Sequence, residues 1–444
     1  MMKLQEAQKL PIAAEVDVLV VGGGPAGVGA AFSAARLGAR TMIVEQFNCL
    51  GGIATAGGHG HICIYTAWAD NHTRIVGGIP YEMAERVQAL GYGNLKPQDV
   101  DFEIEGMKLA LEQMAEECGC QLLYYTIFSD TVMDENKVAG VVVQNKTGRL
   151  FIRARRVIDA TGDGDVAAAA GCGYDQGDPD NGLCQPMTLM FTIGGVEWPK
   201  VRDWRTSYGM NEVWHEAQRK GDMRPFQDHI MGFWWTPTRP DQVGVNFTHI
   251  THMDCTKAED LTAATLEGRK QAYESIDVFR KYAPGMENCY MISTPNVIGT
   301  RESRRIHGDY TLSKEDLMAE RKFDDSIGYG SFFIDIHNVG GPGMDKKTYR
   351  PHKGFKYQIP YGIIVPRDVE NLLVAGRCAS ADHEALGSLR VMPQCGVMGQ
   401  AAGVASQLSL QNQIAPREVN VPELQATLRK QKVIVTDEDI IDQS

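Results

Sequence analysis

Three glycines near the N-terminus carry the clearest chemical signal in this sequence. Gly22, Gly24 and Gly27 follow a short apolar run in a G-x-G-x-x-G pattern, and Glu45 lies 18 residues after Gly27. Glycine at these positions allows a tight turn, close approach of the backbone to a pyrophosphate and close packing of the following helix. A carboxylate at position 45 can accept hydrogen bonds from ribose hydroxyls. The stretch predicts a dinucleotide-binding turn, but the pattern alone does not separate FAD from NAD.

Two further stretches have residue types that suit the surroundings of a bound cofactor. Residues 46–60 are dense in glycine, which keeps the backbone thin beside a flat ligand, and His59 and His61 follow at their end. Residues 159–162, with the sequence DATG, end an apolar strand at a sharp turn. We expect both stretches to lie beside the first glycine turn. A flexible loop and a plain strand-to-loop junction are the alternatives.

A cluster of arginines in residues 299–310 is the densest chemical stretch. Arg301, Arg304 and Arg305 lie within five residues of one another, with Glu302 and Asp309 close by. The guanidinium group offers a fixed fork of donors that matches a carboxylate and stays charged at working pH. Some of these arginines must pair with the neighbouring acids. We therefore expect one or two of them to face a substrate, and a purely structural cluster is the alternative.

The elements that position these residues follow from the apolar pattern. Residues 17–21 and 41–44 predict buried strands on either side of a helix over about 26–37, and residues 101–118 predict an amphipathic helix. Residues 121–126, 138–144 and 150–153 predict the strands of a small antiparallel meander. Further predictions are a long helix over 259–282, a buried strand over 372–375, a loop carrying His383, Glu384, Gly387 and Arg390, and a small-residue helix from about 395.

Length, charge and cysteine usage exclude several classes of function. At 444 residues two domains are more probable than one by length alone. A net charge of −12 argues against nucleic acid or an anionic membrane as the main partner. The N-terminus has no apolar signal segment, so we expect a cytoplasmic location. The ten cysteines form no C-x-x-C motif, which argues against a dithiol reductase and a ferredoxin-type cluster in this chain.

Five separated motifs together resemble a family of FAD-dependent oxidoreductases. They are GGGPAG at 22–27, LGG-x-AT-x-G at 50–57, DATGDGD at 159–165, G-x-RE-x-RRI-x-GDY at 299–310 and VAGR…HEALGS-x-RVMP…GQAAG at 374–403. The layout is more distantly similar to succinate dehydrogenase and fumarate reductase flavoproteins. The resemblance implies FAD as the tightly held cofactor and no metal.

We expect an α/β fold in which a Rossmann-like FAD-binding domain, a parallel sheet with an antiparallel meander, carries an inserted α+β substrate domain. The expected boundaries are 1–182 and 358–412 for the FAD-binding domain, 183–357 for the substrate domain and 413–444 for a C-terminal tail that packs outside the site. The expected cofactor contacts are Gly22, Gly24, Pro25, Ala26, Gly27, Glu45, Gln46, Gly51, Gly52, Ala54, Thr55, Ala160, Thr161, Gly162, Gly376, Arg377, Met392, Pro393, Gly396 and Val397.

Two departures from related flavoproteins matter. Many flavin hydroxylases have Gly-Asp where this chain has Gly376-Arg377, so the carboxylate that they offer the ribitol chain is missing here. There is also no second G-x-G-x-x-G for a nicotinamide dinucleotide. The electron donor or acceptor of the flavin is therefore not visible in the sequence. A homo-oligomer is compatible with the sequence, although no motif supports one.

The resemblance also implies the roles of the catalytic residues. Arg390 corresponds to an arginine near the isoalloxazine and substrate, and with Arg301 and Arg305 it would fix the oxygens of a small carboxylate- or hydroxyl-bearing substrate. His383 would handle the proton because histidine has an ordinary pKa near about 6.5. Its alternative role is a plain hydrogen bond. The expected reaction is hydride transfer at flavin N5. A flavin monooxygenase or oxidase, an electron-transfer subunit and a thiazole-forming protein are the rivals.

Overall fold

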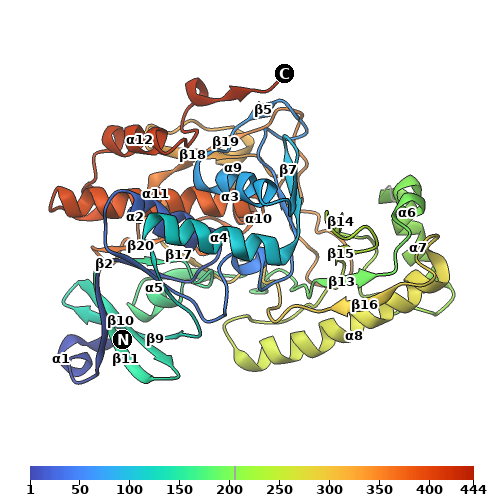
Figure 1. The fold of residues 1–444 in the computed structure, drawn as a ribbon, viewed down its shortest axis with the longest axis horizontal. Helices are drawn as coiled ribbons and strands as arrows, with labels where there is room; N and C mark the ends of the chain where they lie inside the picture. Colours follow the sequence, from blue (N-terminus) through green and yellow to red (C-terminus); the bar gives the residue numbers. More distant parts are fainter. Residues whose placement is uncertain (205–206) are drawn as a thin grey trace.

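A mainly parallel sheet forms the centre of the structure, a computed structural model that describes residues 1–204 and 207–444 (Figure 1). Its parallel strands lie in the order β20-β11-β2-β3-β8. Their bounds are β2 (Ile12–Val21), β3 (Thr41–Val44), β8 (Gln121–Leu123), β11 (Gly148–Asp159) and β20 (Leu372–Val374). The register aligns Val21, Val44, Asp159 and Val374 at one edge. The residues that follow these strand ends are therefore brought together there.

The antiparallel meander differs from the sequence expectation in one strand. It consists of β9 (Ile127–Asp134), β10 (Lys137–Asn145) and the first half of β11, and β1 (Met2–Lys3) extends it. Residues 121–126, which we expected in the meander, instead supply β8, a parallel partner of β3. Strand β8 is short, and its two leucines are half-buried at the edge of the parallel sheet, whereas the longer β9 has both exposed and buried positions and pairs with β10.

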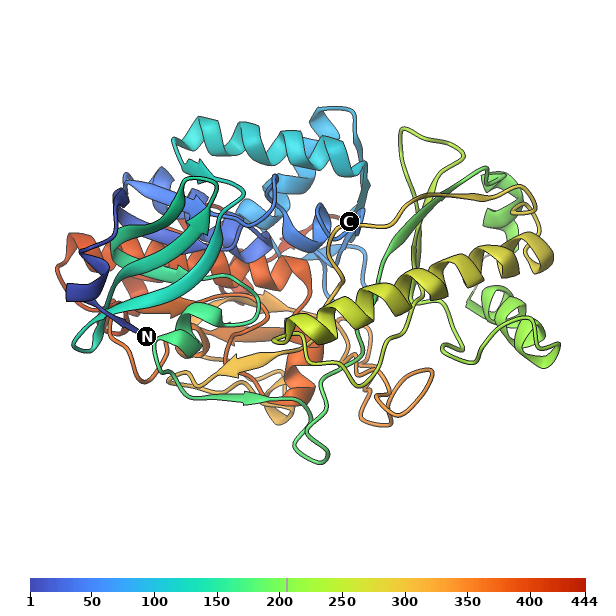
Figure 2. The same ribbon diagram turned by 90° about the horizontal axis from the view of Figure 1, so that it is seen from below.

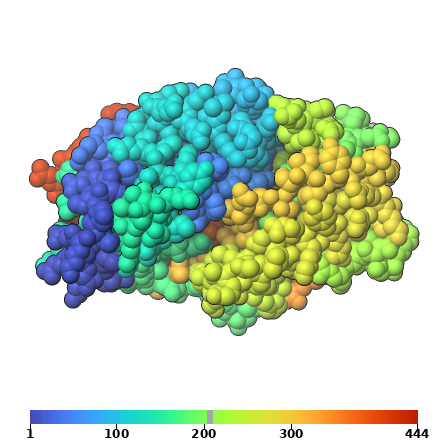
Figure 3. All heavy atoms as spheres, turned by 60° about the horizontal axis from the view of Figure 1, so that its bottom comes forward, coloured from blue at the N-terminus to red at the C-terminus, as the bar shows by residue number. Residues whose placement is uncertain are grey.

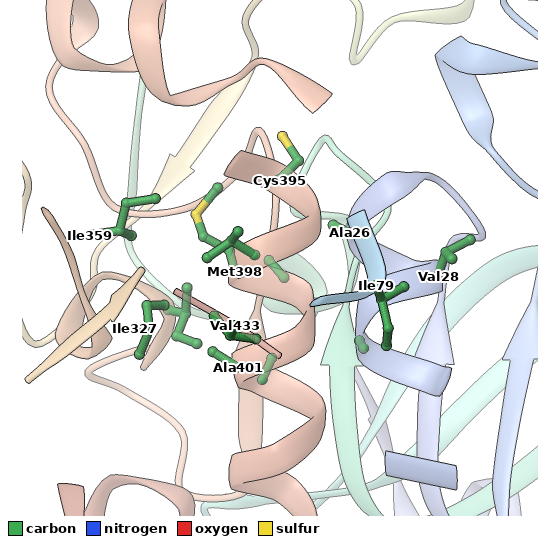
Figure 4. Packing of buried hydrophobic residues seen from close by; sticks show 14 of the residues in the cluster. Ala26, Val28, Ile79, Ile327, Ile359, Cys395, Met398, Ala401 and Val433 are labelled. Atoms are coloured by element: carbon green, nitrogen blue, oxygen red, sulfur yellow. The ribbon is translucent and has the colours of Figure 1, made fainter. Parts of the chain in front are cut away.

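Helix α11 (Met392–Gln411) packs against α2 (Pro25–Arg36) at unusually short range. A Cβ added at Gly399 would lie 1.9 Å from the carbonyl oxygen of Ala26, and one added at Gly403 would lie 2.0 Å from that of Ala30. Figure 4 shows α11 and the first turns of α2 side by side, with Met398 and Ala401 in the packed cluster. Helices α3 (Gly78–Ala89) and α4 (Ile104–Cys118) cover the same core. The small residues of α11 thus serve helix packing along most of its length.

A separate layer, here called the cap, lies beside the main body (Figure 2). Its sheet has the order β14-β15-β13-β16 and is accompanied by three helices. The bounds are β13 (Phe191–Gly194), β14 (Gly232–Trp235), β15 (Val243–Asn246), β16 (Tyr290–Ser293), α6 (Trp198–Trp204), α7 (Ser207–Arg219) and α8 (Ala258–Tyr282). The cap has its own aromatic core, in which the rings of Trp214 and Phe247 stack at 3.8 Å. This confirms the expected fold class, an α/β nucleotide-binding part with an additional domain.

The segment between the cap and residue 357 packs with the main body. Leu312, Leu317, Tyr329 and Tyr357 belong to the same hydrophobic cluster as α2 and α11. The packing thus favours a cap boundary near residue 300 over the expected 357. The elements of this segment are β17 (Arg304–Ile306), α9 (Lys314–Met318), β18 (Ser326–Gly330) and β19 (Tyr357–Pro360).

The remaining elements are short and lie around this body. They are α1 (Leu4–Ala7), β4 (His61–Cys63), β5 (Thr73–Arg74), β6 (Gly93–Leu95), β7 (Asp99–Phe102), α5 (Asp165–Ala169), β12 (Tyr174–Gln176), α10 (His383–Leu389), α12 (Val421–Lys430) and β21 (Ile441–Asp442), with short 3-10 turns at Gly52–Ala54, Tyr361–Ile364, Pro416–Glu418 and Asp437–Asp439. Residues 383–389, expected as loop, are thus helical, because the Asp382 carboxylate caps the Ala385 amide. Among the described helices none has the length and apolar character that a membrane span needs.

Candidate functional site

A cavity of about 1120 Å³ lies between the carboxyl edge of the parallel sheet and the cap. Figure 3 shows the surface hollowed between the main body and the cap. Its walls run from Gly24 in the first glycine turn, past Arg301, to Trp234 of the cap. This volume exceeds the usual range of small-molecule pockets, about 300–1,000 Å³. The cavity therefore has room for a dinucleotide and a small second molecule.

The first glycine turn is open toward this cavity. A Cβ at Gly22 would lie 2.4 Å from the carbonyl oxygen of Ala160, and one at Gly27 would lie 1.9 Å from that of Gly22, so both positions require glycine for packing. A Cβ at Gly24 would meet no atom within 4 Å. Gly24 is also the N-cap of α2 and has no side-chain cap. The free amides at this helix start, beside an unfilled space, fit a pyrophosphate.

Glu45 follows β3 and has a buried carboxylate that lines the cavity. Its two oxygens accept hydrogen bonds from the amides of Gly23 (2.7 Å) and Phe47 (2.9 Å). Burial raises its pKa, and these backbone bonds oppose the shift only in part. A carboxylate has about four acceptor positions, so it can also accept from ribose hydroxyls. The residue thus fits its expected role and in addition fixes the glycine turn.

Arg377 stands where many flavin hydroxylases have an aspartate, and its contacts show how this chain differs from them. Its guanidinium lies 2.8 Å from the Asp163 carboxylate and donates to the Ser303 hydroxyl at 2.8 Å. Burial disfavours the charge, but Asp163 outweighs it and holds the pKa of Arg377 above its usual range. Arg377 and Asp163 both line the cavity. A carboxylate is therefore present on this wall, supplied by the DATGDGD stretch.

The cavity wall includes most of the expected cofactor contacts. Those that line it are Gly22, Gly24, Pro25, Ala26, Glu45, Gln46, Gly52, Ala160, Thr161, Gly162, Gly376, Arg377 and Met392. Those that do not are Gly27, Gly51, Ala54, Thr55, Pro393, Gly396 and Val397. Gly396 shows why: a Cβ there would lie 2.6 Å from Pro80, so this glycine serves the packing of α11.

Two of the three expected substrate arginines reach the cavity. Arg301 and Arg390 line it, whereas Arg305 does not. Arg305 pairs with the Glu302 carboxylate and donates to the Gly177 carbonyl at 3.0 Å. Arg305 is thus part of a structural ion pair, because Glu302 of the same stretch lies close enough to pair with it. Its expected role toward substrate has no support in this geometry.

His383 is buried behind the cavity wall and does not line it. Its Nδ1 lies 2.9 Å from Glu302 Oε1, and its Nε2 lies 3.8 Å from Asp178 Oδ2. Both ring nitrogens thus face carboxylates of the protein. The alternative role, a hydrogen bond that orders the interior, describes this arrangement better than proton transfer.

Asp335 and His337 line the cavity and were not singled out from the sequence. Asp335 Oδ2 lies 2.8 Å from Arg390 Nη2 and 3.3 Å from His337 Nε2. Burial opposes the charge on Asp335, but His337, Arg390 and Arg301 together hold its pKa well below the usual range. Burial, assisted by the charge of Arg301, lowers the pKa of His337 to about 3. The only signal in the sequence was the spacing D-x-H in an apolar context.

The cap side of the cavity is aromatic. His59 stacks on Trp234 with ring centroids 4.6 Å apart, and its Nδ1 is buried without a partner among the described residues. The indole lies over Gly244, where a Cβ would come within 2.2 Å of its nitrogen. Burial lowers the pKa of His59 to about 4, so the ring is neutral at neutral pH. The glycine-rich loop thus closes the cavity against the cap.

A charged network on β4 and β7 forms another part of the wall. His61 pairs across the strands with Asp101 at 2.7 Å, and the Lys96 ammonium lies 2.9 Å from Asp101 and 3.1 Å from Asp99. The donor atoms of His61, Asp99 and Asp101 lie within 4.8 Å of one another and are candidate cation ligands. Lys96 and the protonated His61 together balance the two carboxylates, so these groups form a satisfied ion network without a cation.

Replacing His61 by glutamine should destabilise the protein in a pH-dependent way. Burial alone would lower the pKa of His61, but the bond to Asp101 raises it to about 10. The stability contributed by this raised pKa is fully present below the unfolded value of about 6.5 and is lost as pH rises through 10. Against the effect of burial, His61 and Lys96 lower the pKa of Asp101 in the folded protein, so the stability that Asp101 contributes is lost as the pH falls into the acid range.

The difference in Tm between the native protein and His61→Gln should therefore be largest between about pH 4 and pH 6.5 and should shrink toward pH 10. Thermal unfolding across this range measures it. The control is His72→Gln, since His72 is an exposed histidine outside the network. A Tm difference that is constant across the range would contradict the ion-pair interpretation.

Comparisons with known proteins agree with this geometry. A family model described as FAD dependent oxidoreductase matches residues 17–428. A thiamine thiazole synthase from Aeropyrum pernix is 33% identical over 159 residues, 33% of this chain, and one from Methanococcus aeolicus is 30% identical over 182 residues, 39% of this chain. The matched regions span 54% and 63% of these relatives' own lengths.

Solved structures with a similar chain path include enzymes of several kinds. A geranylgeranyl bacteriochlorophyll reductase-like protein from Thermoplasma acidophilum has a TM-score of 0.49 and 14% identity, covering 94% of this chain and 83% of its own. The protein THI4 from Thermovibrio ammonificans has a TM-score of 0.29 and 24% identity, covering 36% of this chain and 65% of its own.

Proposed function

We propose, from the premise that this chain belongs to the FAD dependent oxidoreductase family, that it transfers a hydride between the flavin and a carbon of a small substrate that carries a carboxylate. FAD is the cofactor that the family uses, and the open glycine turn, the buried Glu45 and the size of the cavity fit it. The substrate's charge is inferred from the arginines on the same wall.

The observation that carries this proposal is the state of Arg301. Its side chain is buried and lines the cavity, and its one hydrogen bond among the described residues goes to the Pro186 carbonyl at 2.6 Å. No carboxylate of the described chain lies within ion-pair distance of it, whereas Arg390 is paired with Asp335. Burial, with the like charge of Arg390, lowers the pKa of Arg301 to about 9. A buried cation with so little compensation favours a bound anion.

The chain's own residues account for binding and orientation. Bound FAD supplies two-electron chemistry at the flavin ring. Arg301 provides the donors that fix a carboxylate, and Asp335 holds Arg390 in place beside it. Phe332 and Phe333 line the same cavity and give it an apolar wall. Fixing the carboxylate limits which carbon of the substrate can face the flavin, and this orientation is the protein's main contribution.

We do not assign thiazole synthesis to this chain. The matched regions cover only 33% and 39% of this chain, and 54% and 63% of the two thiamine thiazole synthases. An oxygen-dependent reaction and a purely electron-transferring role differ from our proposal in what reduces or oxidises the flavin. Both are outcomes of the experiment below.

The test mixes the purified holoprotein, without oxygen, with carboxylic acids and with their uncharged amides. Bleaching of the flavin absorbance by at least one acid and by none of the matching amides is expected, because only the acid satisfies Arg301. Bleaching by a reduced ferredoxin alone would support electron transfer instead. Oxygenated product formed only when air is admitted would support a monooxygenase. Either result would overturn the proposal.

A further inference from the structure

We infer that the substrate is a hydroxy acid and that His337, oriented by Asp335, accepts the proton of its hydroxyl group. This inference rests on the proposed function, since it assigns the class of the anion held by Arg301. It is carried by a group of buried polar atoms around the arginine, all on residues that line the one cavity.

Asp335 and His337 are two residues apart in a segment that is not a regular strand and has isolated β-bridges at Ile334 and His337. Their side chains contact each other, with Asp335 Oδ2 3.3 Å from His337 Nε2. The intervening Ile336 and the preceding Ile334 belong to the main hydrophobic core, so the polar pair is directed away from it. Helix α10 approaches this segment closely because residue 387 is glycine: a Cβ there would lie 3.0 Å from the Asp335 carbonyl oxygen. The pair is therefore held in place by packing from behind.

Six polar atoms on residues that line the cavity are buried and have no partner in the described part of the chain. Two are on cap strands, Trp235 Nε1 and Asn246 Oδ1, and the other four are Asp335 Oδ1, His337 Nδ1, His59 Nδ1 and Arg390 Nε. Buried polar groups are nearly always hydrogen-bonded in folded proteins, and leaving one unpaired costs free energy. A concentration of such atoms beside a guanidinium that has no carboxylate partner in the described chain indicates the groups that a ligand supplies.

Whether each of these atoms donates or accepts a hydrogen bond indicates the chemistry of the ligand. His337 Nε2 faces the ionised Asp335, so the proton of the neutral ring belongs on Nε2, and Nδ1 is left as an acceptor. Asp335 Oδ1 is an acceptor as well. The cation Arg301 thus stands near acceptors that need hydroxyl donors. A molecule with a carboxylate and a neighbouring hydroxyl satisfies both, while a simple carboxylic acid leaves the acceptors unpaired.

The chemistry balances with the family's cofactor as oxidant. Oxidation of a secondary or primary alcohol to a carbonyl breaks one C–H bond and one O–H bond. The carbon gives up its hydrogen with the electron pair to oxidised FAD, and the oxygen gives up a proton to His337 Nδ1 as the C=O double bond forms. Burial and the charge of Arg301 lower the pKa of His337, and a substrate carboxylate on Arg301 offsets that charge, so that the ring can accept the proton. Asp335 acts as a positioning residue, because it fixes which ring nitrogen is free to accept and stabilises the imidazolium that results.

The test measures the binding of acids to the holoprotein after its flavin has been chemically reduced. The reduced flavin cannot accept another hydride, so the measurement reports affinity without turnover. The probes are pairs of acids that differ by hydroxyl groups: glycolate and acetate, lactate and propionate, malate and succinate, gluconate and hexanoate. At least one hydroxy acid should bind about tenfold or more tightly than its partner, because a site built for a hydroxyl rejects the analogue that lacks it. Calorimetric titration gives both affinities.

Three variants assign the selectivity to the pair. In His337→Leu the ratio of the two affinities should fall to near one while the acid without the hydroxyl binds unchanged. His337→Gln retains an acceptor oxygen and should recover part of the ratio. Asp335→Asn should lower the ratio without abolishing binding to Arg301. His352→Leu is the control. His352 is an exposed histidine that pairs with Glu320, and neither residue lines the cavity.

The outcomes separate this inference from the proposed function. Tight binding of acids with equal affinity for both members of every pair overturns the inference and leaves the proposed function standing. A selectivity that survives in both His337→Leu and Asp335→Asn overturns the role of the pair. Failure of all eight acids to bind the native holoprotein overturns the proposed function itself. If His337→Leu loses FAD, the His337→Gln and Asp335→Asn ratios decide the question.

Discussion

Arg301→Met is expected to lower kcat/KM for the carboxylate substrate by about 10²- to 10³-fold while FAD remains bound. Methionine is similar in length but cannot hold the charge. Losing a buried, charge-assisted contact to a ligand costs about 3–4 kcal/mol, which corresponds to that factor. The measurement is the rate of anaerobic flavin bleaching as a function of acid concentration, with the flavin content of each preparation determined by absorbance.

The same variant has a second expected property that a structural arginine would not share. Arg301 has no carboxylate partner in the described chain, so its removal leaves no buried anion behind. The free energy of unfolding should therefore be unchanged or higher, in contrast to the large loss on breaking a buried ion pair. Arg269→Met, at an exposed position on α8, is the control for the substitution itself. A large fall in Tm with normal activity would show that Arg301 is structural.

Gly399→Ala is expected to cause a large loss of stability, although it adds only one methyl group. The added methyl group would lie 1.9 Å from the carbonyl oxygen and 2.7 Å from the carbonyl carbon of Ala26, and backbone atoms cannot rotate away. Helices α2 and α11 must separate, so we expect a loss of about 3 kcal/mol or more. Because both helices begin at the cavity, FAD affinity should fall as well. Thermal unfolding and flavin content measure the two effects.

Gly340→Ala provides the matched control. Its added Cβ would have ordinary contact, 3.5 Å from the Asn338 side chain, and its backbone needs no left-handed conformation. The Tm of this variant should stay near that of the native protein. If Gly399→Ala unfolded at the same temperature as Gly340→Ala, the close contact between α2 and α11 would not exist in solution.

The glycines of α11 show that one sequence pattern, a helix rich in small residues, can serve either helix packing or ligand binding. The sequence predicts Gly396 as a cofactor contact, within a small-residue helix that also contains Gly399. In the structure Gly396 contacts Pro80, and Gly399 contacts the backbone of α2, while only Met392 and Cys395 of this helix start reach the cavity. Small residues satisfy both requirements equally well, so their presence alone cannot distinguish them.

The nucleotide-binding start of the fold can be predicted from local sequence signals. A buried strand, a glycine turn and a small-residue helix are contiguous, and local backbone sterics fix their geometry. Gly22, Gly24 and Glu45, which the sequence predicts as cofactor contacts, line the cavity, and so do residues of the arginine-rich and DATG stretches. The strands 138–144 and 150–153 were also found, because period-two patterning and turn residues are local signals.

Which members of each cluster face the cavity depends on tertiary contacts that the sequence pattern does not show. Arg301 and Arg305 are indistinguishable by type and spacing, yet Glu302 captures Arg305 and leaves Arg301 without a carboxylate. His383 was favoured for proton transfer, but Glu302 and Asp178 enclose it, and His337 stands at the cavity instead. Ion pairing and burial depend on residues that are distant in the chain. These partners exist only once the strands, the cap and helix α10 have come together.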